Sequence, residues 1–255
     1  MCRLLGSVSR GAVTVDDVLG RDRDAFLSLA NKHGDGWGHA WSNGASLDVR
    51  KAPDSALESA ELAELAAGVP AEAAVTHLRW ATLGLGVSTD NTHPFTDGHV
   101  AFAHNGSIDP PAGLDTLIPA DVSALRRGDT DSERFFLALL SRMTTASTGA
   151  ALATTVRDIV DSGVTVKSLN CMLLAPEAFY AVCSYDPSSD ENPDYYPLLY
   201  RQTGDTVVVA STGWTDTAGW QTLSNGQMLV VARESLAMSV VEVATPHDVV
   251  AQARR

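Results

Sequence analysis

The second residue of the chain is a cysteine, and its position gives it two groups that can do chemistry. Once Met1 is removed, Cys2 carries a thiol and a free α-amine on one Cα atom. An α-amine titrates at about 7.7–8.0 and a free thiol at about 8.5, so near neutral pH the amine can take the thiol proton directly or through one water. Such a cysteine is a nucleophile with its own base. Many chains carry a cysteine here without a catalytic role, so the dipeptide predicts a nucleophile only together with other residues.

Two charged residues further along suit the two charged groups of an amino acid. Arg79 ends a strand-like run, and its planar guanidinium fits a carboxylate through two parallel hydrogen bonds. Asp131 stands at the start of a helix-like run, where its carboxylate can hold an ammonium group. Each residue has a structural alternative, which is an internal salt bridge for Arg79 and helix capping for Asp131.

Two glycine-containing motifs offer backbone and amide groups. In Asn105-Gly106, a side-chain amide and a backbone N–H can donate to one developing oxyanion, and losing one such donor costs about 2.7–4 kcal/mol of transition-state stabilisation. The same dipeptide is the commonest signal for a tight β-hairpin. In Gly36-Trp37-Gly38, the backbone can approach a ligand closely beside an indole ring. The alternative there is a plain turn followed by a core tryptophan.

Hydrophobic patterning indicates the elements that must position these residues. We expect a buried strand over Cys2–Val8, which would hold the nucleophile on a rigid element. Further strands are expected over Ala73–Trp80 and over Val100–Ala103. A helix is expected to start within Asp129–Glu133, where Asp or Ser can cap and apolar residues follow on one face. The candidate residues therefore lie at the ends of predicted elements.

The remaining pattern gives further helices and a second group of strands. Helices are expected over Val15–Leu29, where Gly20 interrupts the pattern, and over Ser55–Ala67, Ala150–Val160 and Ala244–Arg255. Asn43-Gly44 predicts a hairpin. Short apolar runs predict strands over Leu169–Leu174, Ala178–Ser184, Leu198–Arg201, Val207–Ala210 and Met228–Ala232. Because no linker or repeat divides the chain, we expect one domain, 2–255, of two packed sheets with helices outside.

Composition narrows the class of protein. The 255 residues include 18 basic and 31 acidic ones, a net charge of -13, with no basic cluster, so nucleic acid is not an expected partner. The three cysteines suit a reducing cytosol better than a disulfide-built domain, and we expect Cys171 and Cys183 to be core residues. No apolar run approaches about 18 residues and no signal-peptide pattern is present. These features predict a soluble, cytoplasmic protein without a membrane partner.

Taken together, the candidate residues stand in six motifs whose order resembles one family. The motifs are Met1-Cys2-Arg3-Leu4-Leu5-Gly6, Asp35-Gly36-Trp37-Gly38, Arg79-Trp80-Ala81-Thr82, Asn91-Thr92-His93-Pro94-Phe95, His104-Asn105-Gly106 and Asp129-Thr130-Asp131-Ser132-Glu133. Their order is similar to that in class II glutamine amidotransferases, which are N-terminal-nucleophile hydrolases. The resemblance covers about Cys2 to Phe136, and the later strands resemble the stand-alone bacterial members.

The resemblance implies an α+β fold, a four-layer αββα sandwich of two antiparallel sheets. It also implies roles. Cys2 would attack the side-chain amide of glutamine, and Asn105 with the N–H of Gly106 would form the oxyanion hole. Arg79 would bind the α-carboxylate of the substrate and Asp131 its α-ammonium. A γ-glutamyl thioester would form and then be hydrolysed by water.

The resemblance further implies that Trp80, Thr82, Gly36 and Trp37 form walls or supports of the substrate pocket. It implies no cofactor and no metal. Leu83 stands where fuller members carry a histidine, which leaves the lid and its substrate contacts open. No synthase domain of the kind that consumes ammonia follows, so an ammonia acceptor is expected on a partner chain or not at all.

Three alternatives stay open. The substrate can be another γ-glutamyl amide, such as the one hydrolysed in ergothioneine assembly by a similar stand-alone enzyme. The protein can also be a catalytically silent γ-glutamyl-binding subunit of a synthase. A different class, a metal hydrolase, would use His77, His93, His99 and His104 with Asp90 or Asp97, although their spacing lacks the usual metal-ligand patterns.

Overall fold

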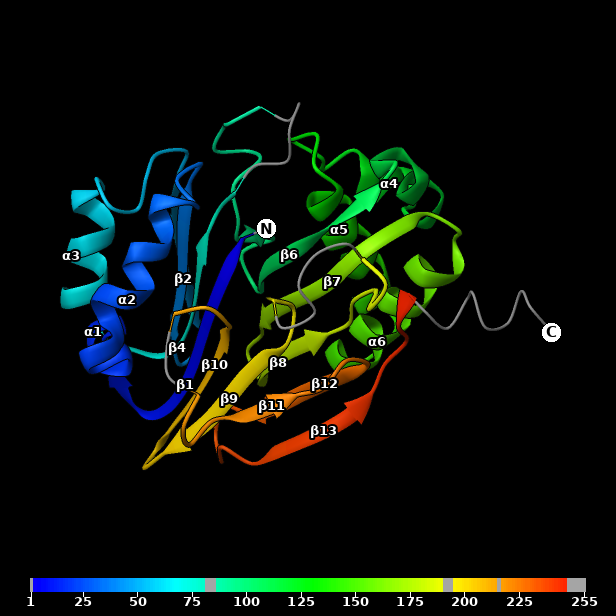
Figure 1. Cartoon of the computed structure of the whole chain (residues 1–255). Helices are drawn as coiled ribbons and strands as arrows, with labels where there is room; N and C mark the ends of the chain where they lie inside the picture. Colours follow the sequence, from blue (N-terminus) through cyan, green and yellow to red (C-terminus); the bar gives the residue numbers. More distant parts are fainter. Residues whose placement is uncertain (1, 81–85, 190–194, 215–216, 247–255) are drawn as a thin grey trace.

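The computed structural model describes residues 2–80, 86–189, 195–214 and 217–246, and the strands in these ranges form two sheets (Figure 1). The first sheet contains β1 (Arg3–Val13), β2 (Trp37–Asn43), β3 (Ser46–Ala52), β4 (Ala71–Leu78), β9 (Leu198–Thr203), β10 (Thr206–Ser211) and β11 (Gln221–Leu223). The second contains β5 (Phe95–Thr96), β6 (Ala101–Asp109), β7 (Thr165–Leu174), β8 (Ala178–Cys183), β12 (Gln227–Ala232) and β13 (Met238–Glu242).

Every neighbouring pair of strands is antiparallel. The order in the first sheet is β11-β9-β10-β1-β4-β2-β3, and in the second it is β13-β12-β8-β7-β6-β5. β1, which follows the candidate nucleophile, is therefore a central strand with β4 and β10 on its two sides. Both edges of β1 are hydrogen-bonded, so the chain segment next to Cys2 is held rigidly.

Helices cover the outer face of each sheet (Figure 1). On the first sheet lie α1 (Val15–Leu19), α2 (Arg23–Ser28) and α3 (Ala60–Gly68), with 3-10 turns η1 (Gly20–Asp22) and η2 (Leu29–Asn31) between them. On the second lie α5 (Asp131–Met143) and α6 (Thr148–Asp161), preceded by η3 (Pro111–Leu117) and α4 (Ala120–Ser123). The expected four-layer αββα sandwich is confirmed.

Alternation along the central strands builds the layers. In β1, Leu4 and Val8 belong to the cluster between the two sheets, whereas Leu5 packs under the helices of the first sheet. This is the two-residue period of a strand buried on both faces. Gly6 lies between Leu4 and Val8 on the same face of β1. It must be glycine, because a Cβ there would overlap the ring of Phe179 from the second sheet. The sheets thus meet closely just behind the chain segment that carries Cys2.

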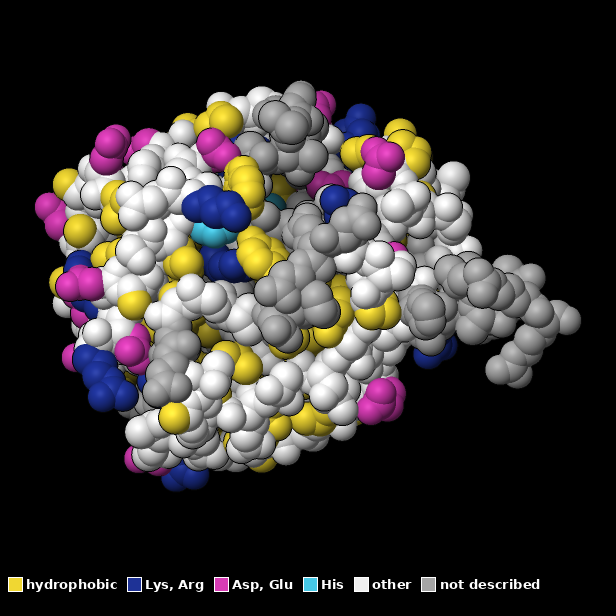
Figure 2. All heavy atoms as spheres, in the orientation of Figure 1, with side chains coloured by type: hydrophobic (Ala, Val, Ile, Leu, Met, Phe, Trp, Pro, Cys, Tyr) yellow, Lys and Arg dark blue, Asp and Glu magenta, His cyan; other side chains and the backbone are white. Residues whose placement is uncertain are grey.

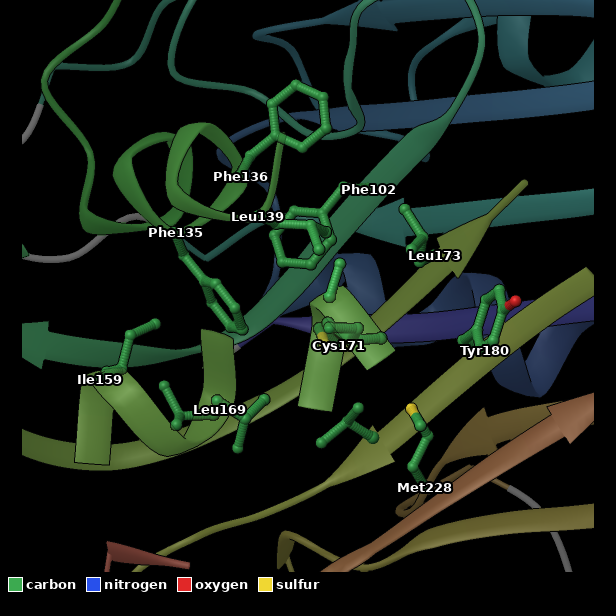
Figure 3. Packing of buried hydrophobic residues seen from close by; sticks show 14 of the residues in the cluster. Phe102, Phe135, Phe136, Leu139, Ile159, Leu169, Cys171, Leu173, Tyr180 and Met228 are labelled. Carbon is green, nitrogen blue, oxygen red and sulfur yellow. The ribbon is translucent and has the colours of Figure 1, made fainter. Parts of the chain in front are cut away.

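A second apolar cluster fixes helix α5 on the outer face of the second sheet. Figure 3 shows Phe102 of β6 among Phe135, Phe136 and Leu139 of α5, with Cys171 of β7 beneath them. The Phe102 and Phe135 rings meet edge to face at 5.0 Å between centroids. Burying a side chain of this size stabilises a fold by about 1.5–3 kcal/mol. The helix start, where Asp131 lies, is therefore anchored by the core.

Several sequence-based expectations need correction. The helix expected over Val15–Leu29 is divided into α1 and α2, because Gly20 adopts a left-handed conformation with φ of 53°. The helix expected over Ser55–Ala67 starts only at Ala60, after the Ser59 hydroxyl caps it. The short strands β5 and β13 were not expected, whereas β11 falls within the expected strand region Trp220–Val231. The helix expected over Ala244–Arg255 lies largely outside the described residues.

Cys171 and Cys183 are completely buried, as expected for core residues. In the described part of the chain, no helix is both long enough and apolar enough to cross a membrane.

Candidate active site

The thiol of Cys2 lies against the backbone of Trp80, which leaves the end of β4. The N–H of Trp80 donates to Sγ of Cys2 at 3.3 Å, and Sγ lies 3.6 Å from the carbonyl oxygen of the same residue. Cys2 is 9% exposed. Burial raises the pKa of the Cys2 thiol, while the Trp80 N–H and the Arg79 guanidinium act in the opposite direction. A thiol in this environment stays protonated until a base removes its proton.

Arg79 is buried at the same end of β4. Its Nη1 donates to the carbonyl oxygen of Asp35 at 3.3 Å and its Nη2 to that of Gly86 at 3.2 Å. Within the described residues its side chain forms no ion pair with a carboxylate, so the internal salt bridge considered as an alternative is absent there. Burial lowers the pKa of Arg79, yet a guanidinium remains charged at any physiological pH. A buried cation held only by carbonyl oxygens can bind an anionic ligand.

Asp131 is the first residue of α5. Thr130 caps the helix through its hydroxyl, which accepts the N–H of Glu133 at 3.1 Å, so Asp131 is not the cap. Instead, Oδ2 of Asp131 accepts the N–H of Ile108 in β6 at 2.8 Å. The carboxylate thus ties the helix start to the strand that carries Asn105.

His104 determines whether Oδ1, the second carboxylate oxygen of Asp131, receives a hydrogen bond from Ser132. His104 Nε2 lies 3.0 Å from the carbonyl oxygen of Ser168, which can only accept, so Nε2 carries the proton. Burial lowers the pKa of His104, and the neutral ring accepts at Nδ1 from the Ser132 hydroxyl at 2.9 Å. Ser132 Oγ is also 3.4 Å from Oδ1 of Asp131, but its proton is engaged by His104. Oδ1 is therefore free to accept from a ligand.

Asn105 and Gly106 lie within β6, paired with Asn170 and Leu169 of β7, and do not form a hairpin turn. Oδ1 of Asn105 is buried and has no hydrogen-bond partner among the described residues. A Cβ at Gly106 would overlap the carbonyl oxygen of Ser168, so only glycine fits there. The carboxamide of Asn105 makes no side-chain hydrogen bond within the described part of the chain, which leaves its N–H donors for a ligand.

Charged side chains from both sheets lie close to the Cys2 sulfur. Arg79 lowers the pKa of the Cys2 thiol and Asp131 raises it, so a positive and a negative group both act on the sulfur. Arg79 comes from the first sheet and Asp131 from a helix on the second. These charged groups come together where the two sheets meet, and Figure 2 shows basic, histidine and hydrophobic side chains beside a hollow on one face of the molecule.

The other predicted pocket residues have different positions. Trp37 is completely buried among the residues that join the first sheet to its helices, and its Nε1 donates to Asp54 at 2.9 Å. The carbonyl oxygen of Gly36 accepts the N–H of Arg79 at 2.8 Å. Trp80 is 38% exposed, with His33 at its edge. Thr82 and Leu83 lie outside the described residues. Gly36 and Trp37 thus contact β4 and the core.

The histidines considered as metal ligands do not converge. His77 and His93 are buried next to each other, with ring centroids 4.3 Å apart. His99, Asp90 and Asp97 are exposed. Across the described ranges, no three His, Cys, Asp or Glu side chains are placed to hold a metal ion. Burial lowers the pKa of His77 to about 3, so its imidazole is neutral at physiological pH.

Sequence reasoning assigned no role to Asn91 and Glu133, which lie beside the pocket. The Glu133 carboxylate accepts the N–H groups of Arg127 and Gly128, each at 2.7 Å. Asn91 is buried and contacts two chain segments through its amide. The pattern Thr130-x-x-Glu133 is a recognisable capping signal. No sequence pattern near Asn91 indicates which chain segments its side-chain amide contacts.

Comparison with known proteins gives a consistent picture. The family model of class-II glutamine amidotransferases matches residues 1–190 of the chain. Gamma-glutamyl-hercynylcysteine sulfoxide hydrolase of Mycobacterium tuberculosis is 25% identical over 250 residues, which cover 95% of this chain and 97% of that protein.

Among solved structures, a glutamine aminotransferase class-II domain protein from Silicibacter pomeroyi aligns with a TM-score of 0.68 and 20% identity, covering 95% of this chain and all of that one. The glutamine phosphoribosylpyrophosphate amidotransferase of B. subtilis aligns with a TM-score of 0.66 and 17% identity over 95% of this chain and 49% of its own. Both structures share the fold.

Proposed function

The chain belongs to the class-II glutamine amidotransferases, and from that premise we propose that it hydrolyses the γ-amide of glutamine through a γ-glutamyl thioester on Cys2. It is an enzyme by family, and its fold is that of the N-terminal-nucleophile hydrolases. The observation that carries the proposal is the placement of the Cys2 thiol against the backbone of Trp80, directly after the buried Arg79, with the Asp131 carboxylate on the side of the second sheet.

Proton transfer would start at the N-terminus. Removal of Met1 frees the α-amine of Cys2, which takes the proton from the thiol. This base is needed because burial raises the pKa of the thiol. The thiolate then attacks the amide carbon of the substrate, and the carbonyl oxygen becomes an oxyanion.

The tetrahedral intermediate would be stabilised by Asn105 and Gly106. The Asn105 carboxamide and the Gly106 N–H donate to the oxyanion, which is the arrangement that lowers the barrier of acyl transfer. The protonated α-amine returns its proton to the leaving nitrogen, which departs as ammonia. The α-amine next takes a proton from water, the hydroxide attacks the thioester, and glutamate leaves while the thiol is restored.

The charged end of the substrate would be held by residues from both sheets. Arg79 binds the α-carboxylate, and its buried position strengthens this pairing because few waters compete. Oδ1 of Asp131 accepts from the α-ammonium, because the Ser132 hydroxyl is engaged by His104. Gly36 supports Arg79 through the backbone, and Trp80, Thr82 and Trp37 are proposed as walls or supports.

The test is intact mass before and after reaction with 6-diazo-5-oxo-L-norleucine, an electrophile that mimics the glutamyl group, followed by peptide mapping. We expect loss of Met1 and one adduct on Cys2. The matched controls are Cys171→Ala and Cys183→Ala, since both thiols are completely buried and should not react. Retained Met1, or adducts at Cys171 or Cys183 in place of Cys2, would contradict the mechanism and favour a silent binding subunit.

A second candidate substrate is a different γ-glutamyl amide. It is favoured by the near full-length match to a relative whose name specifies a γ-glutamyl compound. The same residues would act, and only the leaving group would be larger than ammonia. Turnover of L-glutamine measured beside an N-substituted γ-glutamyl amide, such as a γ-glutamyl anilide, separates the two. If glutamine is the substrate, a protein partner that accepts the ammonia is also proposed.

A further inference from the structure

The side-chain amide of Asn91 joins two segments that are far apart in the sequence. Its Nδ2 donates to the carbonyl oxygen of Gly86 at 3.1 Å, and its Oδ1 accepts the N–H of Asp129 at 2.9 Å. Asn91 is 4% exposed, and the two hydrogen bonds use both ends of the amide. An asparagine carries a donor and an acceptor side by side, which is what this link requires.

The donor end of Asn91 acts on the segment that positions Arg79. The carbonyl oxygen of Gly86 accepts from Nη2 of Arg79 at 3.2 Å as well as from Asn91. Only one other hydrogen bond of the guanidinium occurs in the described structure, to Asp35. The position of the Gly86 carbonyl therefore orients the guanidinium fork.

The acceptor end of Asn91 acts on the segment that positions Asp131. Asp129 lies two residues before Asp131 and directly before Thr130, which caps α5. Gly128 makes this approach possible, because a Cβ there would overlap Oδ1 of Asn91. On the other side of the turn, the Glu133 carboxylate holds the N–H groups of Arg127 and Gly128. Asn91, in the loop between β4 and β5, thus fixes the segment that leads into the helix.

We infer that Asn91 is a positioning residue that sets the distance between the two charged groups of the substrate site, Arg79 and Asp131. This inference rests on the proposed function. Arg79 belongs to one sheet and Asp131 to a helix on the other, so a single rigid amide between their supporting segments fixes the spacing that a zwitterionic ligand must match. Neither of these two hydrogen bonds of the Asn91 amide involves the side chain of Cys2, Arg79 or Asp131.

The test measures how ligands protect Cys2 from alkylation by iodoacetamide in the intact protein. L-glutamate carries both charged groups, glutarate lacks the ammonium, and 4-aminobutyrate lacks the α-carboxylate. The half-protecting concentration of each ligand therefore reports Arg79 and Asp131 separately. Iodoacetamide needs no glutamyl recognition, so its rate without ligand reports the thiol alone.

Asn91→Asp keeps an acceptor for Asp129 but removes the donor to Gly86. We expect the half-protecting concentrations of L-glutamate and glutarate to rise about tenfold or more, which is a loss of about 1.4 kcal/mol, while that of 4-aminobutyrate changes less than about twofold. Asn91→Ala removes both bonds, so all three concentrations should rise. In each variant, the alkylation rate without ligand is the reference from which its half-protecting concentrations are measured.

Ser88→Ala is the matched control. Ser88 lies in the same turn, and its hydroxyl accepts the backbone N–H of Asn91 at 3.3 Å, but no hydrogen bond joins its side chain to Gly86 or Asp129 in the described structure. It should leave all three concentrations unchanged. If wild-type Cys2 is protected but Asn91→Asp weakens the three ligands equally or not at all, the inference is wrong and the proposed function stands. If L-glutamate does not protect even the wild type, both are wrong.

Discussion

The buried histidine His77 should lower the free energy of unfolding at acid pH, and the substitution His77→Phe should remove this contribution. His77 lies in β4 between the sheets, completely buried, and burial is the main reason that its pKa falls to about 3. The nearby charges of Arg79, His104 and His33 lower the pKa further, and the His104 backbone opposes them. The unfolded chain has the ordinary value of about 6.5.

The sign and size of the effect follow from these two values. Since the folded pKa lies below the unfolded one, the unfolded chain binds more protons between about pH 6.5 and pH 3, and stability falls as the pH is lowered through this range. At about pH 4.5, keeping His77 neutral costs about 3 kcal/mol relative to pH 8. That is a large part of the 5–15 kcal/mol typical of a domain.

His77→Phe removes the titrating group while keeping a ring beside His93. The variant loses the contact between the imidazole and the His104 backbone, so we expect the free energy of unfolding at about pH 7.5 to fall by no more than about 1.5 kcal/mol. Below about pH 6, the difference between the variant and the wild type should grow by about 1.4 kcal/mol per pH unit.

The assay is urea unfolding followed by tryptophan fluorescence at a series of pH values. The control is His99→Phe, because His99 is exposed and its replacement should leave the pH dependence unchanged. Parallel curves of unfolding free energy against pH for the wild type and His77→Phe would refute the reasoning. They would mean that His77 is protonated in the folded protein or reached by water.

Two further substitutions test the site. Arg79→Lys should raise KM by about tenfold or more with little change in kcat, because one ammonium cannot contact the carbonyl oxygens of Asp35 and Gly86 and a carboxylate together. Steady-state kinetics with glutamine measure this change. An unchanged KM would mean that Arg79 does not bind the substrate carboxylate. Gly106→Ala should lower the unfolding free energy by at least about 3 kcal/mol, because its Cβ would overlap the Ser168 carbonyl oxygen in the neighbouring strand. A urea unfolding curve that coincides with that of the wild type would contradict the close packing of β6 and β7.

Local sequence signals predicted the elements well where one signal dominated. The short apolar runs in β1 and β10 predicted both strands, and the hairpin at Asn43-Gly44 joins β2 to β3 as expected. The signals failed where two principles competed. Apolar spacing favoured one helix over Val15–Leu29, but the left-handed conformation of Gly20 ended it. β13 is exposed along its length although it carries Met238, Val240 and Val241, and it is a strand because it pairs with β12.

The types of the candidate site residues were set by the sequence alone. Cys2, Arg79, Asn105 and Asp131 each have one chemical capacity that does not depend on the fold, and their order gave the family. Their structural alternatives could not be separated at that level. A pattern of neighbours does not say whether Asn105-Gly106 turns the chain or stays within a strand, or whether Trp37 faces a ligand or the core.

Only the tertiary structure decided those alternatives, because the deciding partners lie far away in the chain. Asn105 is held in β6 by pairing with Asn170, and the Cys2 thiol lies against Trp80. Asn91 reaches Asp129 only because the sheets pack at a fixed distance. Burial and long-range hydrogen bonds depend on how the layers meet, whereas charge, nucleophilicity and backbone freedom belong to each residue from the start.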